Sequence, residues 1–182
     1  MEFINTKIPD VVVIQPKVFE DERGFFMESY QKQSFFDVGI THEFVQDNHS
    51  SSQAYTLRGL HYQVTHTQGK LVRVIIGEIF DVAVDLRKSS PHFGKWVGAH
   101  LSAENKHQLW IPPGFGHGFI ALSPRTDVLY KATDYYDQRG ERCIRWDDPD
   151  LSIDWPIPEG VTPLVSEKDA SAPSFKKAEV FS

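Results

Sequence analysis

Hydrophobic and polar residues alternate with a period of two along most of this chain, which is the pattern of half-buried β-strands. In EIFDVAVDLR, the even positions from Phe80 to Leu86 form one apolar face. The preceding run LVRVII ends at Gly77, so we expect these two runs to form a hairpin with a tight turn. Further strand-like runs are VVVIQPKVF, FFMESYQ, HEFVQDN, KWVGAHLS, QLWI, HGFIALS and VLYKATDYY.

Helical patterns are few. QKQSFFDVG is one candidate, and SEKDASAP can begin a short helix with Ser166 as its N-cap. From residue 145 onward the sequence is irregular, and we expect this tail to wrap over the outside or one mouth of the fold, anchored by Trp146 and Trp155. Many short strands with few helices predict an all-β jelly-roll barrel or sandwich with short peripheral helices.

Length and composition narrow the class of protein. A chain of 182 residues suits one domain with one sizeable core, so we expect a single domain over residues 1–182. The net charge of −6 argues against a nucleic-acid partner. Cys143 is the only cysteine, the first residues do not resemble a secretion signal, and no apolar run reaches membrane-spanning length. We therefore expect a cytoplasmic protein with no membrane partner.

The stretch LRGLHYQVTHTQGK places Arg58, His61 and Lys70 close together in the chain. A histidine can take a proton near neutral pH, while fixed cations can hold phosphates and a developing enolate. This combination suits the removal of a proton from a carbon beside a carbonyl on an anionic substrate. A solvated basic surface is the alternative interpretation of the same residues.

A second motif, IPPGFGHGF, matches the P-x-G-x-x-H pattern that completes the metal site of cupins, a jelly-roll family, through Pro112, Gly114 and His117. The other half of such a site needs H-x-H and then a glutamate, whereas this chain has His61, a tyrosine and Gln63. Two histidines alone are a poor site for a divalent ion. We expect a cupin-like fold without a metal between them; a purely structural His117 is the alternative.

A series of longer blocks runs along most of the chain: DERGFFMESY, FVQDNHS, LRGLHYQ, QGKLVRV, DVAVDLRKSSPHFGKWVG, LSAENKHQLWIPPGFGHGF, LYKATDYY and SEKDASAP. In this order and spacing, from about Ile8 to Pro173, they closely resemble the dTDP-4-dehydrorhamnose 3,5-epimerase family. The resemblance implies a dimeric jelly roll with no metal or nucleotide cofactor. It also implies inversion of C3 and C5 of a dTDP-bound 4-keto-6-deoxyglucose.

The same resemblance implies roles for individual residues. His61 is expected to be the general base, Asp169 the carboxylate that orients it, and Tyr130 the acid on the opposite face of the sugar ring. Lys70 is expected to stabilise the enolate at the C4 oxygen. The positions at which the family contacts its substrate are Arg23, Glu28, Gln46, Asn48, Arg58, His117, Glu141 and Lys168.

Two structural expectations follow. On strict alternation Arg58 and His61 would face opposite sides of a strand, so both can reach one cavity only if the strand ladder is broken near Gly59. A homodimer is also expected, because the apolar run Val11 to Ile14 would make an adhesive sheet edge if left unpaired. If N-terminal segments are exchanged between subunits, Arg23 or Glu28 reaches the partner's cavity.

Two other functions stay open at this point. One is a related enzyme that inverts a single carbon or isomerises the ketone of another dTDP-deoxysugar. The other is a sugar-nucleotide-binding cupin without turnover. The combination of His61, Asp169 and Tyr130 counts against the second, because binding alone does not require a base set against an acid.

Overall fold

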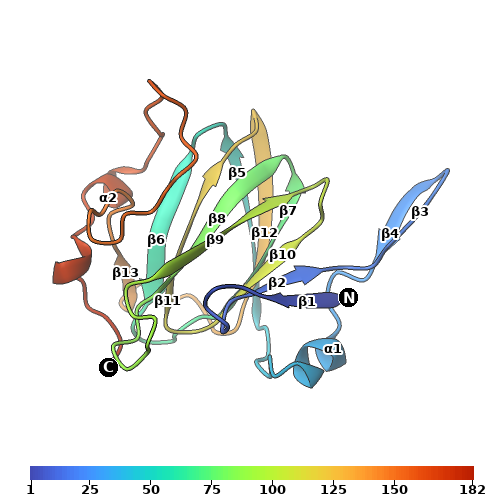
Figure 1. Ribbon diagram of the computed structural model, residues 1–182, viewed down its shortest axis with the longest axis horizontal. Helices are drawn as coiled ribbons and strands as arrows, with labels where there is room; N and C mark the ends of the chain where they lie inside the picture. Colours follow the sequence, from blue (N-terminus) through green and yellow to red (C-terminus); the bar gives the residue numbers. More distant parts are fainter.

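Two antiparallel sheets face each other and form the body of the protein, in a computed structural model that describes residues 1–182 (Figure 1). The six-stranded sheet has the order β1 (Glu2–Asn5), β2 (Val12–Gln15), β10 (Gln108–Ile111), β7 (Lys70–Ile76), β12 (Arg125–Ala132) and β5 (Gln46–Gln53). The five-stranded sheet has the order β13 (Glu141–Cys143), β6 (Leu57–Gln63), β11 (Phe115–Ala121), β8 (Glu78–Asp85) and β9 (Trp96–Ser102). The predicted all-β, jelly-roll class is confirmed.

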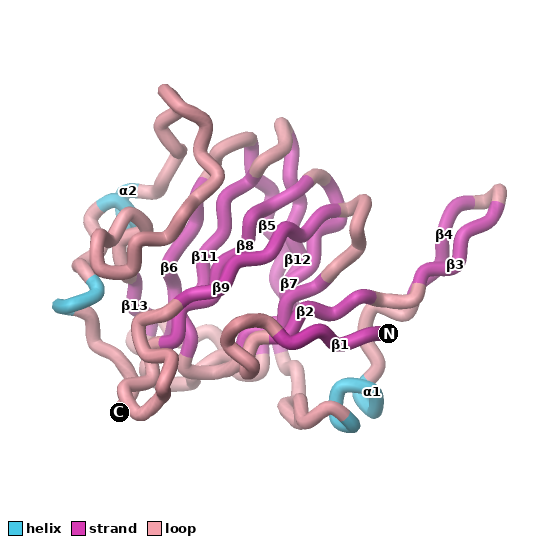
Figure 2. Tube along the Cα trace, in the orientation of Figure 1, coloured by secondary structure: helices cyan, strands magenta, loops and turns pink.

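The remaining elements are short and lie at the periphery, as Figure 2 shows. Strands β3 (Val18–Asp21) and β4 (Gly24–Met27) form a separate hairpin that projects from the body (Figure 1). The helices are α1 (Lys32–Asp37), α2 (Glu167–Ala170) and a 3₁₀ turn, Phe175–Lys177. Both predicted helical segments are confirmed, and Ser166 caps α2 by accepting a hydrogen bond from the backbone of Asp169. None of the helices is long and apolar enough to span a membrane.

The predicted hairpin of the two runs on either side of Gly77 is wrong. Strand β7 pairs with β10 and β12, whereas β8 pairs with β9 and β11 in the other sheet. Gly77, with a φ of +77°, lies where the chain passes from one sheet to the other. Two apolar strands joined by a turn can pair with each other in one sheet or lie in two facing sheets. Which arrangement forms depends on the long-range pairing of both strands.

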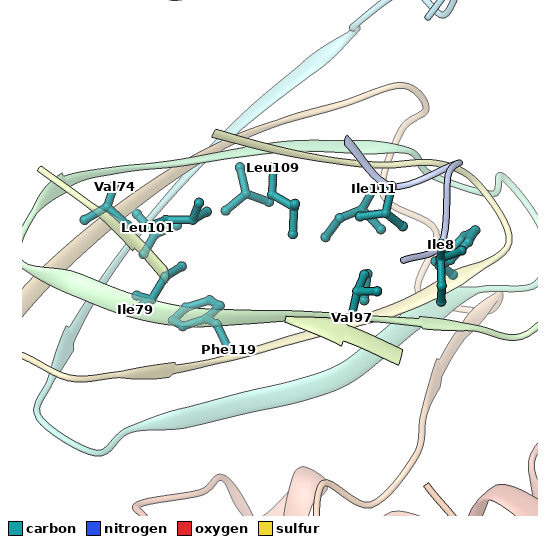
Figure 3. Close-up of a cluster of buried hydrophobic side chains, with 13 residues drawn as sticks. Ile8, Val74, Ile79, Val97, Leu101, Leu109, Ile111 and Phe119 are labelled. Atoms are coloured by element: carbon teal, nitrogen blue, oxygen red, sulfur yellow. The ribbon is translucent and has the colours of Figure 1, made fainter. Parts of the chain in front are cut away.

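An apolar cluster fills the space between the sheets (Figure 3). It contains 13 buried residues, among them Ile79 and Phe119 from the five-stranded sheet and Val74 and Leu109 from the six-stranded sheet. Burying each large side chain stabilises the fold by about 1.5–3 kcal/mol, so this cluster is the main contact between the layers. Tyr130 is partly buried and packs against the border of this cluster, next to the polar part of the interior.

The C-terminal tail covers the outer face of the five-stranded sheet. Leu151 and Trp155 join a second buried cluster with residues of β6, β8 and β11, and the Trp155 indole donates a hydrogen bond of 2.9 Å to the carbonyl of Trp146. The predicted wrapping of the tail, with its tryptophans as anchors, is confirmed. This packing places α2, which carries Asp169, beside β6.

The apolar run from Val11 to Ile14 is not a free sheet edge, so it does not supply the adhesive edge from which a homodimer was expected. Strand β2 pairs with β1 on one side and β10 on the other, and both Val11 and Ile14 are fully buried. Ile14 joins a third cluster with Phe35 of α1 and Trp110, on the outer face of the six-stranded sheet. One edge of this sheet is the short strand β1, whose residues are mostly exposed, and the other edge is β5.

Candidate active site

His61 of β6 and Asp169 of α2 form a histidine–carboxylate pair, with 2.6 Å between Nε2 and Oδ1. The imidazole is 31% exposed, whereas the carboxylate is only 3% exposed. Burial opposes ionisation of Asp169, but hydrogen bonds from His61 and the Gly59 amide outweigh this effect and lower the pKa of the carboxyl group. An ionised carboxylate only accepts hydrogen bonds, so Nε2 carries the proton and Nδ1 is free to accept another.

The strand ladder between β6 and β11 is irregular at Gly59, as predicted. His117 pairs with His61, and Phe119 pairs with Arg58, so two steps along β11 match three steps along β6. Gly59 has a φ of +132°, and a Cβ atom there would collide with the backbone of Gly118. Directly paired residues of adjacent strands lie on the same face of the sheet. His117 and Phe119 are two residues apart and share a face of β11, so their partners His61 and Arg58 face the same side.

A second histidine–carboxylate pair lies deeper in the five-stranded sheet. His117 Nε2 is 2.6 Å from Oδ1 of Asp81, and the two side chains are 7% and 0% exposed. Burial lowers the pKa of His117, although the Asp81 charge opposes this effect. The second carboxylate oxygen of Asp81 is buried without a hydrogen-bond partner. Asp81 was not among the predicted site residues; an aspartate between the apolar residues Phe80 and Val82 was the available signal.

Tyr130 and Lys70 come from the opposite, six-stranded sheet. The Tyr130 ring lies 6.5 Å from the His117 ring and 6.0 Å from the Lys70 ammonium. Burial lowers the pKa of Lys70 to about 8, against the opposing charges of Asp81 and Glu141. Burial also raises the pKa of the Tyr130 phenol, while the positive charge of Arg58 partly offsets this. The interior therefore holds a protonated phenol and a cation opposite the two histidines.

A polar rim borders this interior. Lys168 Nζ lies 2.5 Å from Glu141 Oε2, and the Tyr136 hydroxyl donates a 2.9 Å hydrogen bond to the same oxygen. The backbone of Tyr136 donates to the side chain of Gln46, whose amide in turn donates to Asn48. The structure thus links four predicted binding residues through Tyr136, which was not predicted. An exposed aromatic residue between two predicted site segments was the signal for Tyr136.

Comparison with known proteins identifies the family. The family model described as dTDP-4-dehydrorhamnose 3,5-epimerase matches residues 5–177. The chain belongs to this family. The dTDP-4-dehydrorhamnose 3,5-epimerase of Pseudomonas aeruginosa is 54% identical over 182 residues, which cover 100% of this chain and 99% of that protein.

Solved structures agree with the membership in the dTDP-4-dehydrorhamnose 3,5-epimerase family. The dTDP-6-deoxy-D-glucose-3,5-epimerase of Legionella pneumophila, in complex with dTDP-4-keto-L-rhamnose, is 54% identical with a TM-score of 0.94, over 98% of this chain and 94% of that one. A 3′-monoepimerase of Streptomyces bikiniensis, in complex with dTDP-quinovose, is 30% identical with a TM-score of 0.88, over 95% and 87% of the two chains. The fold is therefore shared by relatives described with one or two inverted carbons.

Two predicted site residues lie apart from the others in this family member. Arg23 is at the tip of the β3–β4 hairpin, where its side chain is 86% exposed and pairs with Asp21 (Figure 1). Glu28 follows directly after β4, at the base of the same hairpin. A single chain therefore does not bring either residue to His61.

The two site histidines of this family member do not fit a cupin metal centre. The Nε2 atoms of the two histidines point to different carboxylates, that of Asp169 for His61 and that of Asp81 for His117, and so do not converge on one ion. Gln63 stands where a second metal-binding histidine would be, and its amide donates a 2.6 Å hydrogen bond to the carbonyl of His66. A third donor shared by both histidines is missing, and a divalent ion requires at least three protein ligands.

Proposed function

We propose that this protein, acting in the cytoplasm without a metal or nucleotide cofactor, inverts C3 and C5 of dTDP-4-dehydro-6-deoxy-D-glucose. The product is dTDP-4-dehydro-L-rhamnose. The observation that carries the proposal is the opposition of the His61–Asp169 pair on one side and Tyr130 on the facing sheet. Inversion of a carbon needs one group that removes a proton from one face and another that returns a proton to the other.

Proton removal falls to His61. Its Nδ1 accepts the proton from the carbon beside the C4 ketone, and the imidazolium that forms keeps its Nε2 hydrogen bond to Asp169. The carboxylate fixes the tautomer before the reaction and stabilises the positive charge during it. Since the ketone at C4 acidifies both neighbouring carbons, one base serves C3 and then C5.

The enolate is the charged intermediate, and Lys70 stabilises it. With a pKa of about 8, the ammonium is mostly protonated at neutral pH, and its burial strengthens its electrostatic effect. The Asp81 charge behind His117 raises the pKa of Lys70 and so helps to keep this cation charged. Electrostatic stabilisation of this kind is commonly worth several kcal/mol in the transition state.

Tyr130 then returns a proton from the opposite face. Burial raises the pKa of its phenol, so the hydroxyl carries its proton at neutral pH. The dTDP group is bound at the rim, where the guanidinium of Arg58 can donate two hydrogen bonds to the diphosphate. Gln46, Asn48, Glu141 and Lys168 hold the rest of the nucleotide-sugar.

Exposed aromatic residues support a homodimer in which the β3–β4 hairpin of one protomer covers the cavity of its partner. Phe19, Phe25 and Phe26 are 53%, 56% and 71% exposed on this projecting hairpin. Large apolar rings gathered on a protruding element are typical of a protein contact. In such a dimer Arg23 and Glu28 complete the partner's site, which explains why a single chain leaves them outside it.

The reaction is tested with dTDP-4-keto-6-deoxyglucose in deuterated water, with NMR at C3 and C5. Deuterium at both carbons is the expected result. Deuterium at one carbon would favour a single-carbon epimerase, as in the Streptomyces relative. Deuterium at neither carbon would favour a binding protein without turnover.

Replacing Tyr130 by Phe should leave part of the exchange while net inversion falls. Equal loss of exchange and inversion, with normal binding, would contradict this division of roles.

The exchanged hairpin is tested by mixing two inactive variants, Arg23→Ala and His61→Ala, after confirming a dimer by light scattering. If the hairpin serves the partner's site, half of the sites in each mixed dimer contain both native residues. Random mixing then restores about a quarter of wild-type activity. If each hairpin serves its own chain, mixing restores nothing.

A further inference from the structure

Three different metal-binding groups meet at the base of the site. Cys143 of β13 pairs directly with His61 of β6, and its Sγ lies 3.6 Å from Oδ1 of Asp169. The His61 nitrogen, the Cys143 sulfur and an Asp169 oxygen all lie within 4.8 Å of one another. They come from two strands and a helix far apart in the sequence. This arrangement differs from the cupin position, because His117 is not part of it.

A tetrahedral ion fits this group only after small movements, because the widest separation of its ligand atoms, up to 4.8 Å, must shorten. Bonds of about 2.0–2.3 Å to nitrogen, oxygen and sulfur set neighbouring ligand atoms about 3.3–3.8 Å apart. The 3.6 Å between the Cys143 sulfur and the Asp169 oxygen already falls in this range. The 2.6 Å between His61 and Asp169 must widen by less than about 1 Å. The Gly59 amide holds the other carboxylate oxygen, so Oδ1 can change partners while Asp169 stays in place.

We propose that His61, Cys143 and Asp169 form an inhibitory site for a thiophilic divalent cation such as Zn²⁺. An imidazole, a thiolate and a carboxylate are a ligand set that this ion prefers over Mg²⁺ or Ca²⁺. The imidazole is 31% exposed, so the ion enters from the substrate side and keeps one position for water. The charges of Lys168 and Glu141 near the site offset each other through their ion pair.

Binding of the ion disables the base through a change of tautomer. The lone pair of Nε2 goes to the metal, so the single proton of the neutral imidazole moves to Nδ1. Burial raises the pKa of the Cys143 thiol to about 12, so the thiol releases its proton to water only as the sulfur binds the ion. Nδ1 can then no longer accept a proton from substrate carbon. This consequence rests on the proposed role of His61, whereas the metal site itself does not.

The first test follows Co²⁺ bound to the purified protein, because a cobalt–thiolate bond gives a charge-transfer absorption band. Cys143 is the only cysteine, so any such band reports this site alone. We expect one Co²⁺ per chain, a tetrahedral spectrum, and displacement by Zn²⁺. The band should vanish in Cys143→Ala and weaken in His61→Ala. Bound Co²⁺ without a thiolate band in the wild-type protein would overturn the proposal. This result does not depend on whether any variant folds.

The second test measures proton exchange in the presence of Zn²⁺. Wild-type activity should fall and recover on chelation, while Cys143→Ala and Cys143→Ser should stay active and resist Zn²⁺ at least about 10-fold better. The matched control is His66→Ala, which removes an exposed histidine 3.3 Å from Asp134 with no thiol beside it. It should leave Zn²⁺ sensitivity unchanged.

Equal inhibition of wild type and Cys143→Ala by Zn²⁺ would overturn the inhibitory site. A thiolate band with full activity would leave the metal site but contradict His61 as the base.

Discussion

The two histidine–carboxylate pairs have the same length and very different surroundings. Both measure 2.6 Å, but the imidazole of His61 is 31% exposed and that of His117 only 7%. His61 retains an accessible nitrogen, whereas burial lowers the pKa of His117 and keeps its imidazole neutral. The comparison shows that access, more than hydrogen-bond geometry, separates a proton carrier from a group that shapes the electrostatics of the site.

The two histidine–carboxylate pairs also differ in how the fold holds them together. Asp81 and His117 lie on adjacent strands of one sheet, so the sheet itself holds the buried pair together. Asp169 reaches His61 from the C-terminal tail, which is 108 residues further along the chain. The pair held within the sheet is buried in both members, whereas the pair closed by the tail leaves its imidazole partly exposed.

The largest expected contrast is in catalysis. Replacing His61 by Ala should reduce proton exchange at both carbons by about 10²–10⁴-fold, because it removes the proton acceptor. Exchange is measured by NMR in deuterated water, with substrate binding checked by calorimetry. His66→Ala is the matched control for loss of an exposed histidine beside a carboxylate. Retention of exchange within about tenfold of wild type would exclude His61 as the base.

The buried pair should dominate stability. Replacing His117 by Ala leaves the Asp81 carboxylate buried without a partner and should cost about 3–5 kcal/mol in the free energy of unfolding. His61→Ala should cost less, about 1–3 kcal/mol, because Asp169 keeps the Gly59 amide. Urea denaturation of the two variants gives both values. Equal costs would mean that the surroundings of the two pairs matter less than their common geometry.

The buried pair should also influence the pH dependence of activity through Lys70. Activity should decline above about pH 8, where Lys70 loses its proton. The Asp81 charge raises the pKa of Lys70, so Asp81→Asn should move this decline to lower pH by about 1 unit. The pH–rate profiles of the two proteins decide the point. An unchanged alkaline limb in the variant would show that Asp81 does not act on the lysine.

The smallest effect concerns stability in mild acid. Since burial lowers the pKa of folded His117, the unfolded chain binds its proton more readily than the folded chain does. The stability from neutral His117 is therefore present above its unfolded pKa of about 6.5 and is lost as the pH falls through the lowered value. Below pH 6.5, wild type should lose up to about 1.4 kcal/mol per pH unit more than His117→Gln. Parallel pH–stability curves from denaturant titrations would contradict this account.

The local pattern of the sequence was sufficient for the strand-rich fold, the capped helix at Ser166 and the break at Gly59. Each depends on neighbouring residues alone: alternation, a hydroxyl before an acidic turn, and a glycine where a side chain would collide. The motif around His61 and the resemblance to a family led to the candidate residues. Glycine at position 59 also indicated how Arg58 and His61 face one side.

Only the tertiary structure decided which distant residues meet. Strands β7 and β8 looked like a hairpin but belong to facing sheets, and the run from Val11 to Ile14 is paired rather than free. The pairing of His117 with Asp81, 36 residues apart, and the approach of Cys143 to Asp169 had no local signal. The physical reason is that side-chain alternation specifies which face of a strand is buried, while the partner on that face is chosen by packing of the whole chain.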